Sequence, residues 1–189
     1  MATRDFARSV AGWGRLVASR RLTSPKAKLG ARLRFADGSS SFVFRETAVT
    51  DAGMSDPTLL VISFRLAALG SNGRLHAAFR RECILHTPLF AGFPGFASKL
   101  WIDDVETGVY RGVYQWQGGD LARHYAARMV ALLAPFSNAG TARYQVVDQI
   151  RRDEFLLRPQ LAPADGEGDW WRLAEPISLR PAHTSEEAA

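Results

Sequence analysis

Four histidines and two strand arginines are the residues of this sequence best suited to acid–base or anion-binding chemistry. His86 ends a predicted helix, directly before a turn rich in proline and glycine. A general base at the mouth of a pocket could remove a phenolic proton, an effect worth about 100- to 10,000-fold in rate. A histidine at a helix end also commonly binds the last carbonyls of its own helix, and that alternative stays open. His76 and His124 are expected at the surface, and His183 lies in the tail.

Arg65 and Arg111 lie in predicted strands that are otherwise built largely of apolar residues. A buried unpaired charge is costly, so an arginine that points inward needs a partner. That partner could be Asp148 or an anionic group of a ligand; the alternatives are pairing within the fold and exposure at a strand edge. We predict Arg65 as an electrostatic anchor in a catalytic site with His86, and Arg111 as a substrate contact.

Three aromatic side chains on neighbouring predicted strands offer flat walls for an aromatic substrate: Trp101, Tyr110 and Tyr114. Ordinary core packing explains them equally well. We predict them as substrate-binding residues and keep the packing alternative open.

Several kinds of chemistry have no motif in this sequence. It contains no GxGxxG, Walker, HExxH or CxxC pattern, and we expect no bound metal or cofactor. The single cysteine, Cys83, is expected to be a small core residue, and it suits a reducing compartment. No apolar run approaches the roughly 20 residues that span a bilayer, and no secretory signal is recognisable. We therefore expect a soluble, cytoplasmic protein with no membrane span.

The positive charge is concentrated in the first 34 residues, which carry nine basic residues and one acid, Asp5. Such an arm can attract phosphate or anionic lipid, although a solvated extension is the commoner case. Phe6, Val10, Trp13 and Val17 are spaced for one face of a helix. The spacing predicts a short amphipathic helix that docks on its own domain.

The elements that must position these residues follow in the order β-α-β-β-α-β, which is the split pattern of ferredoxin-like α+β folds. We expect the core elements at 58–66, 74–86, 96–103, 108–117, 121–134 and 142–150. A basic extension (1–57) with a β-hairpin near 31–48 precedes the core domain (58–155). An irregular tail follows (156–189), in which Trp170 and Trp171 should pack onto something.

Two helices can cover only one face of a four-stranded antiparallel sheet. On either face the predicted strands leave large apolar groups, such as those of Leu60, Ile62 and Phe64 on one side and Leu59 and Val61 on the other. If it were left uncovered, such a face would have a larger area than the exposed apolar patches usual for monomers. A homodimer is the predicted cover, and cover by the chain's own hairpin or tryptophan-bearing tail is the alternative.

One stretch of the core also resembles a known group of proteins. A Gly-Phe-Pro-Gly turn at 92–95 is followed by Lys-Leu-Trp at 99–101, a Thr-Gly hairpin at 107–108 and a Gly-Val-Tyr strand at 108–110. This order resembles the dimeric α/β-barrel superfamily, particularly the YdhR-like proteins, which are grouped with monooxygenases. The resemblance covers about 58–152 and implies a ferredoxin-like domain that pairs into a dimeric barrel around an apolar cavity.

The resemblance implies two functions between which the sequence does not decide. One is a cofactor-independent monooxygenase or cyclase of secondary metabolism that acts on a hydrophobic aromatic or polyketide-like molecule. The other is a non-catalytic small-molecule-binding or accessory protein of the same fold. The haem-degrading branch pairs a strand Asn with a Trp and a helix His; Trp116 and His124 are present here, but 58–66 contains no Asn.

Nucleic-acid binding is a third function that this order of elements permits, since RNA-binding domains share it. The strand 108–117 lacks the basic-glycine-aromatic pattern that such domains use to stack bases. We therefore expect no nucleic-acid partner.

Overall fold

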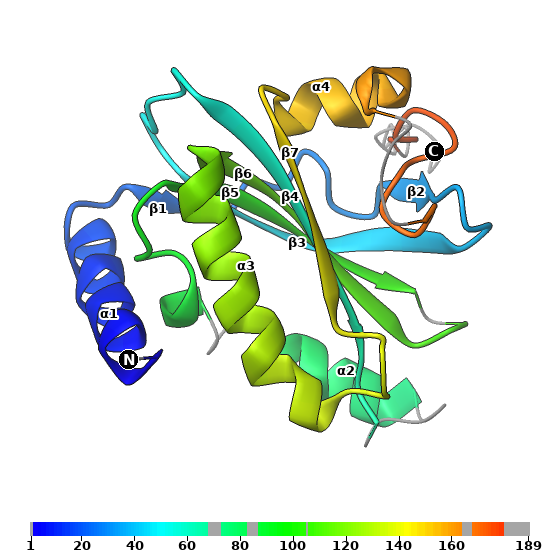
Figure 1. Ribbon diagram of the computed structural model, residues 1–189, viewed down its shortest axis with the longest axis horizontal. Helices are drawn as coiled ribbons and strands as arrows, with labels where there is room; N and C mark the ends of the chain where they lie inside the picture. The colour runs from blue at the N-terminus through cyan, green and yellow to red at the C-terminus, as the bar shows by residue number, and fades with distance from the viewer. Residues whose placement is uncertain (1, 68–72, 83–86, 105, 164–167, 180–189) are drawn as a thin grey trace, which may run out of the picture.

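The structure is a computed structural model that describes residues 2–67, 73–82, 87–104, 106–163 and 168–179. Its elements form one antiparallel sheet with helices on both sides (Figure 1). The helices are α1 (Ala2–Ala18), α2 (Gly73–Glu82), α3 (Gly119–Leu133) and α4 (Arg152–Leu157), with 3-10 turns η1 (Thr87–Leu89), η2 (Ala134–Phe136) and η3 (Pro159–Leu161). The strands are β1 (Leu22–Thr23), β2 (Arg32–Arg34), β3 (Ser40–Val49), β4 (Pro57–Arg65), β5 (Phe96–Asp104), β6 (Val109–Gln117) and β7 (Arg143–Asp148).

The strand order confirms the predicted α+β, ferredoxin-like core. In the order β1-β3-β5-β6-β4-β7, the first core strand, β4, lies between β6 and β7, and β5 lies beyond β6. The predicted hairpin forms from β2 and β3. Strand β3 then pairs with β5 and widens the core sheet, so the sheet runs past the boundary predicted at residue 57.

One face of the sheet, here called the helix face, is covered by helices. Alternation along β4 points Leu60 and Ile62 to this face, where they pack with side chains of β6 and α3. Helix α3 contributes the apolar stripe Ala122, Tyr125, Ala126 and Met129. Figure 1 shows α1, α2 and α3 on this side of the strands.

The opposite face, here called the tail face, is covered by the chain itself. Leu59 and Val61 of β4 pack there in one cluster with Phe155 of α4. Trp170 and Trp171 of the C-terminal segment belong to the same cluster. Residues Ala31, Leu33 and Phe35 of the N-terminal part belong to the same cluster. In Figure 1, α4, β2 and the C-terminal segment lie together on this side. The predicted docking of the two tryptophans is thus confirmed.

This cover removes the reason for which a homodimer was predicted. The apolar face assigned to a second copy is buried within one chain: Leu59 and Val61 are 0% exposed. The premise that two helices leave a face open was wrong because two segments expected to be irregular or peripheral act as a second layer. The burial of this face does not test the dimer itself, only the reason given for it.

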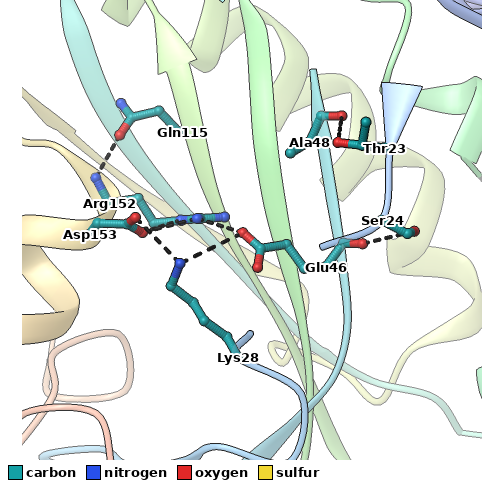
Figure 2. A network of polar contacts seen from close by, with 8 residues as sticks. All are labelled: Thr23, Ser24, Lys28, Glu46, Ala48, Gln115, Arg152 and Asp153. Atoms are coloured by element: carbon teal, nitrogen blue, oxygen red, sulfur yellow. Dashed lines mark hydrogen bonds and ion pairs between the residues drawn. The ribbon is translucent and has the colours of Figure 1, made fainter. Parts of the chain in front are cut away.

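A network of ion pairs and hydrogen bonds ties this second layer to the sheet (Figure 2). Arg152 of α4 binds Glu46 of β3 at 2.7 Å, and both side chains are buried. Lys28 joins Glu46 at 4.0 Å and Asp153 at 3.3 Å. The backbone N–H of Arg152 donates to the Gln115 side chain of β6 at 2.6 Å. Four separate parts of the chain therefore meet at one polar centre on the tail face.

Helix α1 docks on the domain as predicted, but not through the whole predicted face, because Val10 and Val17 are 46% and 47% exposed. The Ser9 hydroxyl donates to the carbonyl of Pro88 at 2.7 Å, and Trp13 packs against the core cluster of the helix face. The backbones of Gly12 and Gly92 meet so closely that a Cβ on Gly12 would lie 2.5 Å from the Gly92 carbonyl oxygen.

Among the described helices, none combines the length and the hydropathy needed to cross a membrane.

Candidate ligand-binding site beneath helix α2

A small pocket, here called the α2 pocket, lies on the helix face between α2 and the strands β3 to β6. Its volume is about 20 Å³. Its lining consists mostly of aromatic rings around one lysine: Phe44, Phe64, Phe79, Lys99, Trp101, Ile102, Tyr110, Arg111 and Gly112. A mostly apolar wall with few polar groups is the usual composition of a small-molecule site.

The charge in this pocket belongs to Lys99, which is only 7% exposed. Its ammonium lies 3.2 Å from the centroid of the Trp101 ring, 4.6 Å from that of Phe90 and 4.9 Å from that of Tyr114. Aromatic faces attract a cation, and the attraction reaches about 2 kcal/mol where water is excluded. The cation is therefore held in place by rings from β5, β6 and the loop after η1.

Trp101 is fixed on the strand by several neighbours. Its indole N–H donates to the Thr47 hydroxyl at 3.2 Å, and Phe44 lies 6.2 Å away, centroid to centroid. A register shift between Val43 and Arg45 interrupts the pairing of β3 with β5 at this point. The Arg45 guanidinium lies 5.7 Å from the Trp101 ring. One wall of the pocket is thus a rigid indole.

The floor of the pocket depends on Gly112, the partner of Trp101 in the sheet. A Cβ at Gly112 would lie 2.5 Å from the Tyr114 ring, so only glycine allows that ring to lie across the strand here. Behind it, the Tyr114 and Tyr125 hydroxyls are 3.4 Å apart in the core. Complete burial, together with Tyr114, raises the pKa of Tyr125 well above its usual value. The Tyr125 phenol is therefore neutral at physiological pH.

Helix α2 covers the pocket through two neighbouring residues. The Phe79 ring lies 4.7 Å from that of Tyr110 and 6.4 Å from that of Phe64. Arg80 binds Asp103 of β5 at 2.5 Å, and the carboxylate is fully buried. Asp103 lies two residues after Trp101 on β5, so both side chains point to the same face of the sheet. The ion pair therefore lies beside the pocket, on the helix face.

The structure brings three of the predicted substrate-binding residues together. Trp101 and Tyr110 line the α2 pocket. Tyr114 is 2% exposed and lies behind them, where it contacts the Lys99 ammonium and the core. Tyr114 therefore shapes the environment of Lys99 from the core side.

Arg111, the fourth predicted substrate contact, directs its guanidinium to the tail face. Its nitrogens donate to Asp37 at 2.8 Å, to Ser39 at 2.9 Å, to Ser41 at 3.3 Å and to the carbonyl of Trp170 at 3.1 Å. The partner proposed from sequence, Asp148, instead binds Arg123. Arg111 thus fastens the hairpin tip and the tail to the sheet.

Among the residues that the structure describes, neither of the two predicted catalytic residues lines the α2 pocket. Arg65 is exposed at the end of β4, and alternation puts it on the side of Val61 and Ser63, opposite the pocket. His86 and His183 lie outside the described residues. His124 is exposed on α3.

Lys99 was missed by reasoning from the sequence. A lysine in an alternating strand is normally read as solvent-exposed. The signal that could have found it is its position two residues before Trp101, on the same side of a strand, facing a neighbouring strand rich in Tyr and Trp. The buried pair Glu46–Arg152 was also missed, because the two residues are far apart in sequence.

No metal-ligand cluster is found among the described residues: no group of three or more His, Cys, Asp or Glu side chains could hold an ion. The chemistry available in the α2 pocket is therefore that of one ammonium, one phenol and several aromatic faces, within the part of the chain described.

The fold and this pocket define the class to which the chain can be assigned, a ferredoxin-like α+β protein with a small aromatic pocket on its helix face. No family model matches the chain, and no curated protein matches it. Solved structures of the same general fold do.

Three such structures come from Listeria. A haem-degrading enzyme of Listeria monocytogenes has a TM-score of 0.40 and 9% identity, over 66% of this chain and 95% of its own. A monooxygenase-like protein of Listeria innocua has a TM-score of 0.38 and 12% identity, over 59% and 65%. A ferredoxin-fold protein of Listeria monocytogenes related to antibiotic biosynthesis monooxygenases has a TM-score of 0.41 and 8% identity, over 72% and 86%. Similarity at this level concerns the fold, so the function must be argued from the site.

Proposed function

We propose that this chain binds a small aromatic molecule in the α2 pocket, in its anionic form, and activates it as a cofactor-independent monooxygenase or cyclase. The observation that supports the proposal is the position of Lys99. A buried ammonium on the wall of an aromatic pocket is suited to hold a phenolate or enolate oxygen. No other lysine of the chain is comparable: Lys26 is exposed and Lys28 lies on the tail face.

The arrangement assigns a role to each wall of the pocket. Trp101 and Tyr110 would hold a flat ring by stacking and edge contacts. Lys99 would stabilise the negative charge that develops on the substrate oxygen, with little water present to weaken the attraction. The electron-rich anion would then close a ring or react with dioxygen. In the second case the phenol supplies four electrons: one oxygen atom becomes the new carbonyl of a quinone, and the other leaves as water.

The size of the pocket sets a condition on this function. A space of about 20 Å³ is enough for a water molecule. An aromatic ring is larger, so its entry requires the Phe79 side chain of α2 to move away from Tyr110. Phe79 is only partly buried and belongs to a helix held at this end by the Arg80–Asp103 pair.

The predicted roles of His86 and Arg65 change under this proposal. Lys99 takes the role of electrostatic anchor, because Arg65 lies on the opposite side of the sheet. His86 remains a proposed acid–base residue, at the end of the predicted helix that includes α2. The haem alternative has little support, since Trp116 is buried in the core and His124 is exposed.

A non-catalytic binding protein is the second candidate, and one observation favours it. The described residues that line the α2 pocket include no histidine, cysteine or carboxylate. Such a pocket can hold an anion without transferring a proton. Both candidates share the anion site at Lys99, so that site is tested first.

The test uses 4-nitrophenol, whose phenolate absorbs visible light, at a pH at which the free probe is mainly protonated. We expect the wild type to bind it as the yellow phenolate. Lys99→Met keeps the length of the side chain and removes its charge, so binding of the phenolate should fall at least about tenfold. Lys26→Met is the matched control and should bind as the wild type does. Equal binding by Lys99→Met and wild type would refute the site.

Oxygen uptake then separates the two candidates. An enzyme should consume dioxygen when supplied with a hydroquinone, at a rate that Lys99→Met reduces. Binding of the phenolate without any uptake, across a panel of hydroquinones and naphthols, would favour the non-catalytic protein.

A further inference from the structure

A second hollow, here called the α1 groove, runs between α1 and the body of the domain. Its volume is about 580 Å³, within the range of roughly 300–1,000 Å³ typical of small-molecule sites. Helix α1 forms one wall, and the turn after β3 and the loop before β5 form the others. Trp101, Tyr110 and Lys99 take no part in it, so it is separate from the α2 pocket.

The walls of this groove are held in place on both sides of α1. The Ser9 hydroxyl binds the Pro88 carbonyl, and Gly12 meets Gly92 at backbone contact. Beyond the C-terminal end of α1, the Arg21 guanidinium donates to the carbonyls of Thr50 and Asp51 at 3.1 and 3.3 Å. The groove therefore persists as a feature of the packed domain.

The interior of the groove is apolar at its base and basic at its rim. Leu16, Val49, Phe93 and Phe96 supply the apolar base. Arg15 and Arg21 supply two positive charges, and the lining includes no aspartate or glutamate. Arg21 is fixed by the backbone carbonyls that it binds, whereas the exposed Arg15 guanidinium makes no hydrogen bond or ion pair with any residue that the structure describes.

This combination selects one chemical class of ligand. An arginine fork matches the planar oxygens of a carboxylate and the oxygens of a phosphate or sulfonate. Residues 2–21, which form α1 and the turn after it, carry five arginines and one aspartate, and this excess attracts anions toward this side of the molecule. An apolar body on the ligand would cover Phe93 and Phe96 while its anionic group met Arg15.

We propose that the α1 groove binds a small organic anion, with an apolar body on the base of the groove and an anionic group at Arg15 and Arg21. The site gives the basic N-terminal segment a role as one wall of a binding site. It does not depend on the function proposed for the α2 pocket.

The test uses 8-anilinonaphthalene-1-sulfonate, an apolar fluorescent anion, with the full-length protein. We expect a single saturable site whose affinity falls as salt is added. Arg15→Ala should weaken binding at least about tenfold, because one charge-assisted contact is lost. Arg8→Ala is the control: it removes the same charge from an exposed position of the same helix, outside the groove, and should change affinity less than about twofold.

A second pair of variants tests the location without changing charge. A Cβ at Gly53, in the wall of the groove, or at Gly14, outside it, would meet nothing within 4 Å. Gly53→Leu should block the probe, and Gly14→Leu should not. Equal weakening by Arg8→Ala and Arg15→Ala would show diffuse attraction to the basic arm and overturn the proposal. Unchanged binding by Gly53→Leu would overturn it as well. Lys99→Met should bind the probe normally, which separates this site from the α2 pocket.

Discussion

At the scale of single residues, the surroundings of each buried cation distinguish a structural role from a ligand-binding one. Arg111 donates to four partners that belong to the hairpin tip, β3 and the tail. Arg152 is paired with Glu46 and Asp153. Lys99 lies on the wall of a pocket, with three aromatic rings around its ammonium. The two arginines therefore join elements of the fold, and Lys99 is the buried cation for which we propose a ligand.

We expect acid to weaken the ion pairs that Asp37 and Asp153 make on the tail face. Burial alone would raise the pKa of Asp37, but hydrogen bonds from Ser39 and the charge of Arg111 outweigh it and bring the pKa below its ordinary value of 3.8. For Asp153 burial is likewise outweighed, by Arg152 and Lys28. A carboxyl with a lowered pKa stabilises the fold above its unfolded pKa, and this stabilisation is lost as the pH falls through the folded pKa.

We therefore predict that the free energy of unfolding, measured by urea denaturation, falls as the pH is taken from neutrality to below 3.8. Asp37→Asn should lower stability at neutral pH and make the acid-induced loss smaller. Asp51→Asn, at an exposed turn position, is the control and should keep the full pH dependence. A loss of the same size in Asp37→Asn and wild type would contradict the role of Asp37.

At the scale of elements, the attachment of α1 depends on two glycines. A Cβ at Gly92 would lie 1.7 Å from the carbonyl oxygen of Ser9 and 2.4 Å from the backbone nitrogen of Trp13. These are backbone atoms of a helix, so the clash is relieved only if α1 moves.

Gly92→Ala should therefore release α1, at a cost of about 1–3 kcal/mol in unfolding free energy. Hydrogen exchange across residues 8–18 should become faster, while β4 and β6 stay protected. Gly14→Ala is the control, because its Cβ meets nothing within 4 Å; it should leave α1 docked and raise stability by up to about 1 kcal/mol. Protected α1 amides in Gly92→Ala would refute the contact.

The C-terminal segment is expected to behave as core. Trp171 is fully buried and stacks on Phe155 at 6.3 Å. Trp171→Ala should cost about 3–5 kcal/mol, measured by thermal or urea unfolding. Leu179→Ala, in the same segment but 54% exposed, should change stability by less than about 0.5 kcal/mol. Similar small losses for both variants would mean that the segment does not cover the sheet.

Much of the core could be predicted from the sequence, because its signals are local. The apolar run of β4, the alternation of β6 and the stripe of α3 each follow the period of one element. The pairing of β3 with β5 and the docking of Trp171 join residues far apart in the chain and leave no periodic pattern. Trp101 and Tyr110 were predicted for the site by residue type. The charge at Lys99 was not, because its burial depends on rings from several elements.

At the scale of the whole molecule, one chain builds both layers that flank the sheet. The helix face carries the α2 pocket and borders the α1 groove, and the tail face is closed by α4, the tryptophans and the hairpin. A single chain of 20.8 kDa thus has no large sheet face left to cover among its described residues. We therefore expect a monomer with its own complete anion site at Lys99.

Sedimentation in the presence of 4-nitrophenol tests this central claim most directly, since it follows the protein and the phenolate colour in one run. We predict that the colour sediments with a single species of 20.8 kDa and is lost with Lys99→Met, which itself sediments unchanged. Colour that sediments with a species of twice that mass, or that persists with Lys99→Met, would contradict it.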